Sequence, residues 1–153
     1  MTDRLVFIMR SAAFITAVFL VSVTTTYSQS VTNTATAGPI RSSPAYSEVL
    51  LRKTEIKADL EALSADYTEA NPKIMDLRFE LSVLDKLLER IFGVSPSETG
   101  KLTLALGKLI VRQAALETEL ARLKRTYSKD HPEVKRAERK VEIFDSSVRE
   151  VLR

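Results

Sequence analysis

The chain has 153 residues, a formal net charge of +3 and no cysteine. The absence of thiols excludes disulfide bonds, thiolate metal sites and a cysteine nucleophile, and so small a net charge gives no argument for a nucleic-acid partner. Glycine, proline and aromatic residues are scarce, as is typical of elongated helical proteins. The composition therefore predicts a small all-α protein.

Residues 1–28 have the pattern of a signal peptide. Two arginines come first, and the apolar run 11–23 follows them. This run is too short for a spanning helix, which needs about 20 apolar residues, so we expect cleavage after Ser28. The alternative is an uncleaved anchor over residues 5–23, which would then be the only membrane contact. Either interpretation predicts an exported protein of the periplasm or cell envelope.

Residues 29–42 are rich in Ser, Thr, Ala and Asn and show no apolar periodicity. This composition predicts a flexible linker.

A helical hairpin is predicted over residues 43–93. Ser43-Pro44 and Asn71-Pro72 each place a helix-capping residue before a proline at the first helical position. The apolar residues between and after them are spaced by three and four, which gives each helix one apolar seam of coiled-coil type. Two helices joined by so short a turn must run antiparallel. The seams are Tyr46, Val49, Lys53, Ile56, Leu60, Leu63 and Tyr67, then Ile74, Leu77, Leu81, Leu84, Leu88 and Ile91.

A second hairpin is predicted over residues 94–153. Ser95 and Glu98 have capping-box spacing around Pro96, so the third helix is expected from Pro96 to about Lys129. Gly93 before it is suited to a left-handed helix end. His131-Pro132 forms the turn into the fourth helix. The seams are Leu102, Leu106, Leu109, Gln113, Leu116, Leu120, Leu123 and Tyr127, then Val134, Ala137, Val141, Phe144, Val148 and Val151.

The two hairpins are an internal repeat with an offset of 60 residues. This shift aligns every seam position without a gap and places Lys53 on Gln113. The predicted fold is therefore two tandem antiparallel hairpins. Identical pairs include Arg52/Arg112, Leu60/Leu120, Leu63/Leu123, Tyr67/Tyr127, Pro72/Pro132 and Asp85/Asp145.

Apolar residues beside the seams predict that the hairpins pack against each other or against other copies of the chain. Burial of each large side chain is worth about 1.5 to 3 kcal/mol, so nine exposed ones would forfeit much of a domain's stability. We expect an up-down-up-down four-helix bundle, the alternative being docking against other copies. Residues 46–93 hold 7 Lys/Arg and 10 Asp/Glu (−3), and residues 106–153 hold 12 and 8 (+4), which favours docking within the chain. The nine are Leu50, Leu51, Phe79, Val83, Leu87, Ile110, Val111, Ile143 and Leu152.

The hairpin turns contain the first candidate site residues. His131 is the only histidine, and a metal site needs three or four converging ligands, so we interpret His131 as a helix N-cap like Asn71. Asp85 and Asp145 are interpreted as parts of solvated helix faces. No catalytic, cofactor-binding or metal-binding residue is predicted, and an enzyme is not expected. The predicted turn residues are Tyr67, Asn71, Pro72, Tyr127, His131 and Pro132.

A basic cluster flanks the second turn. It lacks the interleaved aromatic residues that stack on nucleic-acid bases, so nucleic acid is not an expected partner. Contact with the acidic hairpin, or with an anionic polysaccharide, is expected instead. The cluster contains Arg122, Lys124, Arg125, Lys129, Lys135, Arg136, Arg139 and Lys140.

The segment 120–141 resembles the periplasmic coiled-coil region of the polysaccharide co-polymerase, or chain-length-determinant, family. Members carry a leucine-spaced helix, a tyrosine, His-Pro and a hydrophobic residue. The match falls here on Leu120, Leu123, Tyr127, His131, Pro132 and Val134. Residues 60–81 are a weaker copy. The family's second membrane segment, membrane-proximal α/β domain and kinase motifs have no counterpart in this sequence. The resemblance therefore implies a detached hairpin module beside an envelope polysaccharide export system.

These observations predict an exported, non-enzymatic protein that acts through protein–protein contacts in the bacterial envelope, as an accessory of polysaccharide polymerisation or export. A partner protein or self-association is expected. The alternative is a periplasmic holdase chaperone with helical arms, because small basic exported helical proteins include chaperones of outer-membrane proteins.

Overall fold

The computed structural model describes residues 38–153. The predicted signal peptide, residues 1–28, and most of the predicted linker lie outside the described residues. The end of that linker is not irregular, because Gly38–Arg41 forms a short helix, α1. The Ile40 side chain is buried in the core. The prediction of a flexible linker as far as residue 42 is therefore wrong for its last residues.

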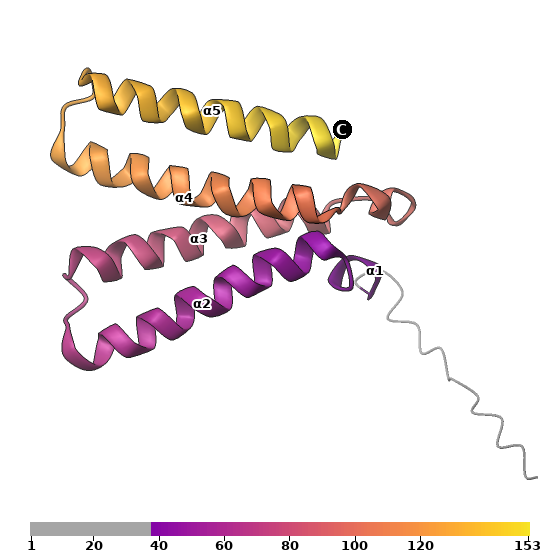
Figure 1. Cartoon of the computed structure of the whole chain (residues 1–153), viewed down its shortest axis with the longest axis horizontal. Helices are drawn as coiled ribbons and strands as arrows, with labels where there is room; N and C mark the ends of the chain where they lie inside the picture. Colours follow the sequence, from indigo (N-terminus) through magenta and orange to yellow (C-terminus); the bar gives the residue numbers. More distant parts are fainter. Residues whose placement is uncertain (1–37) are drawn as a thin grey trace, which may run out of the picture. The chain divides into compact units, whose positions relative to one another are not determined.

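The described residues form helices and turns without a strand, so the all-α prediction is confirmed (Figure 1). Four long helices make two hairpins, and a 3-10 helix, η1, lies between the hairpins. The elements after α1 are α2 (Pro44–Asp66), α3 (Pro72–Phe92), η1 (Pro96–Lys101), α4 (Leu104–Thr126) and α5 (Pro132–Leu152).

The predicted caps start three of the long helices. The Tyr46 amide donates a hydrogen bond of 3.3 Å to the Ser43 hydroxyl oxygen at the start of α2. Asn71 and His131 cap α3 and α5, and each of these three helices has a proline in its first turn. Proline fits there because the first helical N–H groups have no partner within the helix.

The predicted start of the third helix is wrong. Pro96 begins η1, and the Ser95 hydroxyl lies 2.9 Å from the Ser97 hydroxyl, so no side-chain cap forms. Helix α4 starts eight residues later, where Thr103 accepts a hydrogen bond of 3.3 Å from the Leu106 amide. Thr103 is 60 residues after Ser43, so the repeat extends to the caps. Gly93 is also not left-handed, with φ −75° and ψ −8°.

The four long helices run up-down-up-down, as predicted, with both hairpin turns at one end (Figure 1). They do not close into a square bundle. Helix α4 is central and packs against α2, α3 and α5, whereas α5 packs chiefly along α4. Seam spacing predicts which residues are buried but does not predict which helix meets which.

The core contains most seam residues. Helices α2 and α4 approach each other closely at Gly107. A Cβ atom built on Gly107 would lie 3.0 Å from the Ala45 Cα and 2.8 Å from the Glu48 Cβ. Glycine is therefore required there by the close approach of the two helices. The largest fully buried apolar side chains are Val49, Ile56, Ile74, Leu84, Ile91, Leu102, Leu106, Ile110, Val134 and Val148.

The hairpins dock on each other within the chain. Val83, Leu87 and Ile110 are buried, and Val111 and Leu152 pack against the core. The other four flanking apolar residues, Leu50, Leu51, Phe79 and Ile143, remain exposed, so the expectation that docking covers all nine is wrong for them. Ion pairs of Arg125 with Asp76 and of Arg90 with Asp145 join the hairpins. The first of these pairs a basic residue of the second hairpin with an acidic residue of the first, as the charge division predicts.

Candidate functional site

The first predicted turn ends one helix and caps the next. Tyr67 follows α2, and its amide donates to the Leu63 carbonyl oxygen. The Lys73 amide donates a hydrogen bond of 2.8 Å to the Asn71 side-chain oxygen, beside Pro72 at the first position of α3. These contacts account for the turn by local hydrogen bonding alone.

The second predicted turn repeats this geometry with a histidine. The Glu133 amide donates a hydrogen bond of 3.3 Å to Nδ1 of His131, with Pro132 between them. The Tyr127 ring stacks on the His131 ring, with centroids 4.2 Å apart and planes inclined by 18°. His131 is placed as a helix cap.

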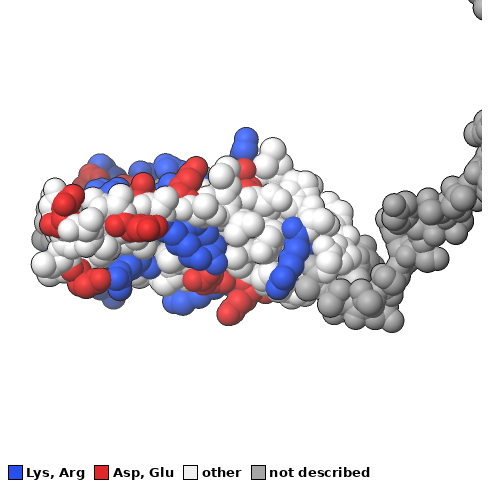
Figure 2. All heavy atoms as spheres, turned by 90° about the horizontal axis from the view of Figure 1, so that it is seen from below, with Lys and Arg blue, Asp and Glu red and all other residues white. Residues whose placement is uncertain are grey.

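Four of the eight residues in the predicted basic cluster form ion pairs. Lys124 pairs with Glu138 (2.8 Å), Arg125 with Asp76, Lys135 with Asp130 (3.2 Å) and Arg136 with Glu133 (2.8 Å). Among residues 38–153, Arg122, Lys129, Arg139 and Lys140 form no ion pair. Figure 2 shows basic and acidic side chains interleaved on the face that it presents, and not a separate basic patch.

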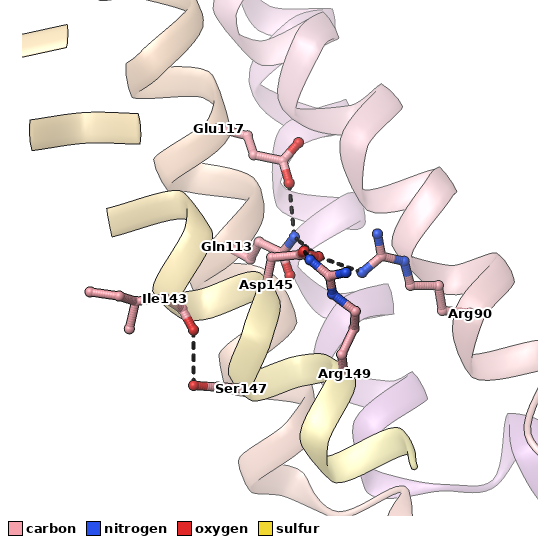
Figure 3. Close-up of polar contacts among 7 residues, drawn as sticks. All are labelled: Arg90, Gln113, Glu117, Ile143, Asp145, Ser147 and Arg149. Atoms are coloured by element: carbon pink, nitrogen blue, oxygen red, sulfur yellow. Dashed lines mark hydrogen bonds and ion pairs between the residues drawn. The ribbon is translucent and has the colours of Figure 1, made fainter. Parts of the chain in front are cut away.

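A polar network that the sequence did not predict joins α3, α4 and α5 at Asp145 (Figure 3). Gln113, which is 1 % exposed, donates from Nε2 to Asp145 Oδ1 at 3.2 Å and to Glu117 Oε1 at 2.9 Å. Arg90 donates to the same Asp145 oxygen at 2.8 Å, and Arg149 pairs with the other oxygen. Asp145 is therefore not part of a merely solvated helix face.

The network keeps Asp145 ionised. Partial burial raises the pKa of its carboxyl group, but hydrogen bonds from Arg90 and Arg149 lower it by more, so the pKa lies below its ordinary value. A carboxylate held by two guanidinium groups accepts hydrogen bonds and is a poor proton donor at neutral pH. We therefore assign the network to holding α5 against α3 and α4.

The first hairpin also has a polar contact at the positions that correspond to Gln113 and Asp145. Lys53 pairs with Asp85, and each lies 60 residues before Gln113 and Asp145. The signal was present in the sequence, because Lys53 and Gln113 are the only polar seam positions and Asp85 and Asp145 are identical. Only the packing shows that each polar seam residue faces its aspartate.

A groove lies beside the network, between α3, α4 and α5. Its volume is about 590 Å³. Phe79, Leu120, Ala121 and Val141 give it an apolar lining. Its charged lining has four carboxylates and two cations: Glu117, Glu138, Glu142 and Asp145, with Arg90 and Lys124.

The groove is negatively charged although the chain is basic. Arg90 pairs with Asp145 and Lys124 pairs with Glu138, so both cations are already held by carboxylates. The hydrogen bond from Lys124 lowers the pKa of Glu138, which keeps that carboxylate charged. An apolar groove with an excess of carboxylates suits an apolar segment that carries Lys or Arg.

Within residues 38–153, His, Asp and Glu side chains do not cluster as three or more potential metal ligands. In the same range, helices with the length and hydropathy needed to cross a membrane are absent. Comparison with models of protein families, with curated proteins and with solved structures finds no match to this chain.

Proposed function

We propose that this chain is an exported, non-enzymatic helical protein that acts through protein–protein contacts in the bacterial envelope. The observation that carries the proposal is the open groove between α3, α4 and α5. Helix α5 packs chiefly along α4 and covers little of α3. Apolar residues of α3, α4 and α5 therefore remain accessible in this groove. Phe79 of α3 is 37 % exposed there.

The chemistry of the groove supports a helical protein as the partner. Its apolar lining suits an amphipathic helix, and its carboxylates suit basic residues beside the apolar face of that helix. The segment 120–141, which resembles the coiled-coil region of polysaccharide co-polymerases, supplies Leu120, Ala121, Lys124, Glu138 and Val141 to the lining. The proposal is therefore an accessory that binds a protein of polysaccharide polymerisation or export.

Site-specific photo-crosslinking in living cells tests this proposal. A photoreactive phenylalanine analogue is introduced at Phe79, and Phe92 serves as the matched control because it lies on the same helix and is 41 % exposed. We expect position 79, and not 92, to crosslink an envelope protein that mass spectrometry identifies. The Phe79→Glu variant should prevent capture by a tag elsewhere in the chain.

The outcomes separate the parts of the proposal. Equal crosslinking at both positions, or none at 79, would refute the groove as the binding site. An envelope partner outside polysaccharide metabolism would refute the polysaccharide link and leave the contact function standing. Recovery of the chain from the cytosol alone would refute export.

A holdase chaperone is the second candidate, favoured by the exposed apolar side chains distributed over α2, α3, α4 and α5. Such a protein binds unfolded chains at several weak apolar sites. It should suppress aggregation of an unfolded outer-membrane protein at stoichiometric amounts, and Phe79→Glu should change this activity little. Aggregation at the rate of the chaperone-free sample would exclude this function.

A further inference from the structure

The repeat predicts how a third hairpin would be placed. Helices α2 and α4 begin and end 60 residues apart, and so do α3 and α5. We call two positions equivalent when they differ by 60. In repeat proteins each unit buries the face that its neighbour leaves open, and only the terminal units show an uncovered face.

Within the chain, α4 covers one stripe of α3. Glu80 lies on this stripe and shares the α3–α4 junction with Ala115. Val83, one turn further, is 3 % exposed. Its equivalent on α5 is Ile143, which is 59 % exposed. In Figure 3 the Ile143 side chain points away from Asp145, and therefore away from the groove.

The opposite face shows the complementary pattern. Ile110 lies on the stripe of α4 that crosses the first hairpin, and it is fully buried. Its equivalent on α2 is Leu50, which is 44 % exposed. Leu51, equivalent to the partly buried Val111, is 57 % exposed. Helix α2 thus exposes the stripe that is equivalent to the docking stripe of α4. Helix α5 exposes the stripe that is equivalent to the part of α3 on which α4 docks.

The charges beside these stripes are also complementary. At the junction inside the chain, Asp76 and Glu80 of α3 share a pocket with Ala115, Glu119 and Arg122 of α4. The equivalents of Asp76 and Glu80 are Arg136 and Lys140, and those of Ala115 and Glu119 are Glu55 and Asp59. Lys73 lines the same pocket, and its equivalent is Glu133. The receiving face of α5 therefore carries two cations and one carboxylate, and the docking face of α2 carries two carboxylates.

We propose that copies of this chain stack head to tail, with the α2 face of one copy docked on the α5 face of the next. The docking face is Leu50, Leu51, Glu55 and Asp59, and the receiving face is Arg136, Lys140 and Ile143. The contact joins two different surfaces, so it is heterologous and leaves a free face at each end. It goes beyond the proposed function because neither surface belongs to the groove.

By the same repeat, docking also brings α2 of one copy across α4 of the next, and this crossing differs from the α2–α4 crossing inside the chain. Ser47 stands where α4 has Gly107, and a Cβ at Gly107 would overlap Ala45 and Glu48. The crossing between copies is consequently wider than the crossing inside the chain. A wider crossing buries less apolar area, which gives a weaker contact between copies than between hairpins.

Cysteine crosslinking tests the pairing, because the full chain has no cysteine of its own. Leu50→Cys and Ile143→Cys chains, each prepared separately, are mixed and treated with a short bis-maleimide. We expect crosslinks between the two variants and not within either variant alone. Lys86→Cys, at an exposed position of α3 that belongs to neither face, is the control and should give no crosslink with either variant. Crosslinking of Leu50→Cys with itself, or no crosslinking above the control, would overturn the proposal.

Sedimentation over a range of concentrations measures how strongly the copies associate. Ile143→Glu should weaken self-association by about tenfold or more, since it buries a charge against Leu50. Lys140→Glu should also weaken it, and adding Glu55→Lys should restore it. A chain that is monomeric at every concentration would overturn the proposal. Phe79→Glu should leave association unchanged, so failure of stacking and failure of the groove are read out separately.

Discussion

Gln113 donates a hydrogen bond of 3.2 Å to Asp145 across the α4–α5 interface, at the positions where the first hairpin has Lys53 and Asp85. Both hairpins therefore keep a polar contact at the same level of an otherwise apolar seam. Gln113 is 1 % exposed, so a slip of α5 along α4 would leave its amide buried without this partner, and the contact therefore fixes the register of these two helices.

Loss of the Asp145 charge should destabilise the fold. In Asp145→Asn the ion pairs with Arg90 and Arg149 are lost, and we expect the free energy of unfolding to fall by about 1 to 3 kcal/mol. Asp85→Asn is the matched control. The Asp85 side chain is 56 % exposed, so its substitution should have an effect below about 1 kcal/mol. Urea denaturation followed by circular dichroism measures both, and equal effects would contradict the role given to the network.

The same carboxylate should make stability depend on pH in acid. The pKa of Asp145 is lower in the folded chain than in the unfolded chain, so its ionised form stabilises the fold above the unfolded value. That contribution disappears as pH falls through the folded pKa. We expect the stability difference between the unchanged chain and Asp145→Asn to shrink steadily below about pH 4, near the ordinary aspartate pKa. A difference that stays constant from neutral pH to pH 2 would contradict this.

The close crossing of α2 and α4 should make Gly107 intolerant of a side chain. Gly107→Ala places a methyl group against Ala45 and Glu48, and overpacking of this kind costs about 1 to 3 kcal/mol. Gly100→Ala is the control, because a Cβ at Gly100 would meet nothing within 4 Å. That change should leave stability unchanged or raise it by up to about 1 kcal/mol. The midpoint of thermal unfolding should fall in Gly107→Ala and should rise or stay unchanged in Gly100→Ala.

The cap of α5 should accept asparagine in place of histidine. In His131→Ala the Glu133 amide loses its side-chain acceptor, which should cost about 1 kcal/mol. His131→Asn supplies the same cap that Asn71 provides to α3, so it should retain most of the stability. If both variants were equally destabilised, stacking on Tyr127 and not capping would be the main contribution of His131.

Much of the fold could be predicted from sequence because its signals are local. Ser43-Pro44, Asn71-Pro72 and His131-Pro132 mark helix starts by short-range hydrogen bonding, and those three starts are correct. Ser95-Pro96 carries the same local signal but begins only a 3-10 helix. The repeat would have corrected this error, since Thr103 is the position equivalent to Ser43.

The site depends on which helices meet, and local signals do not contain that information. Val83 and Ile143 are equivalent and similarly apolar, yet Val83 is buried in the core and Ile143 is 59 % exposed. The groove arises because α5 packs chiefly along α4, and its lining combines residues from three helices. The faces that were expected to be buried within the chain remain open for that reason.

The order of the helices has a consequence for folding. The three helices that share most of the core, α2, α3 and α4, precede α5 in the chain and are complete before α5 is synthesised. Helix α5 contributes only Val148 to the buried core cluster of the described residues, so we expect it to be the first helix to detach. Amide hydrogen exchange should show its outer turns exchanging faster than any turn of α4. A terminal helix that opens without unfolding the others would detach and rejoin reversibly. In the closed state Asp145 holds α5 against α3 and α4.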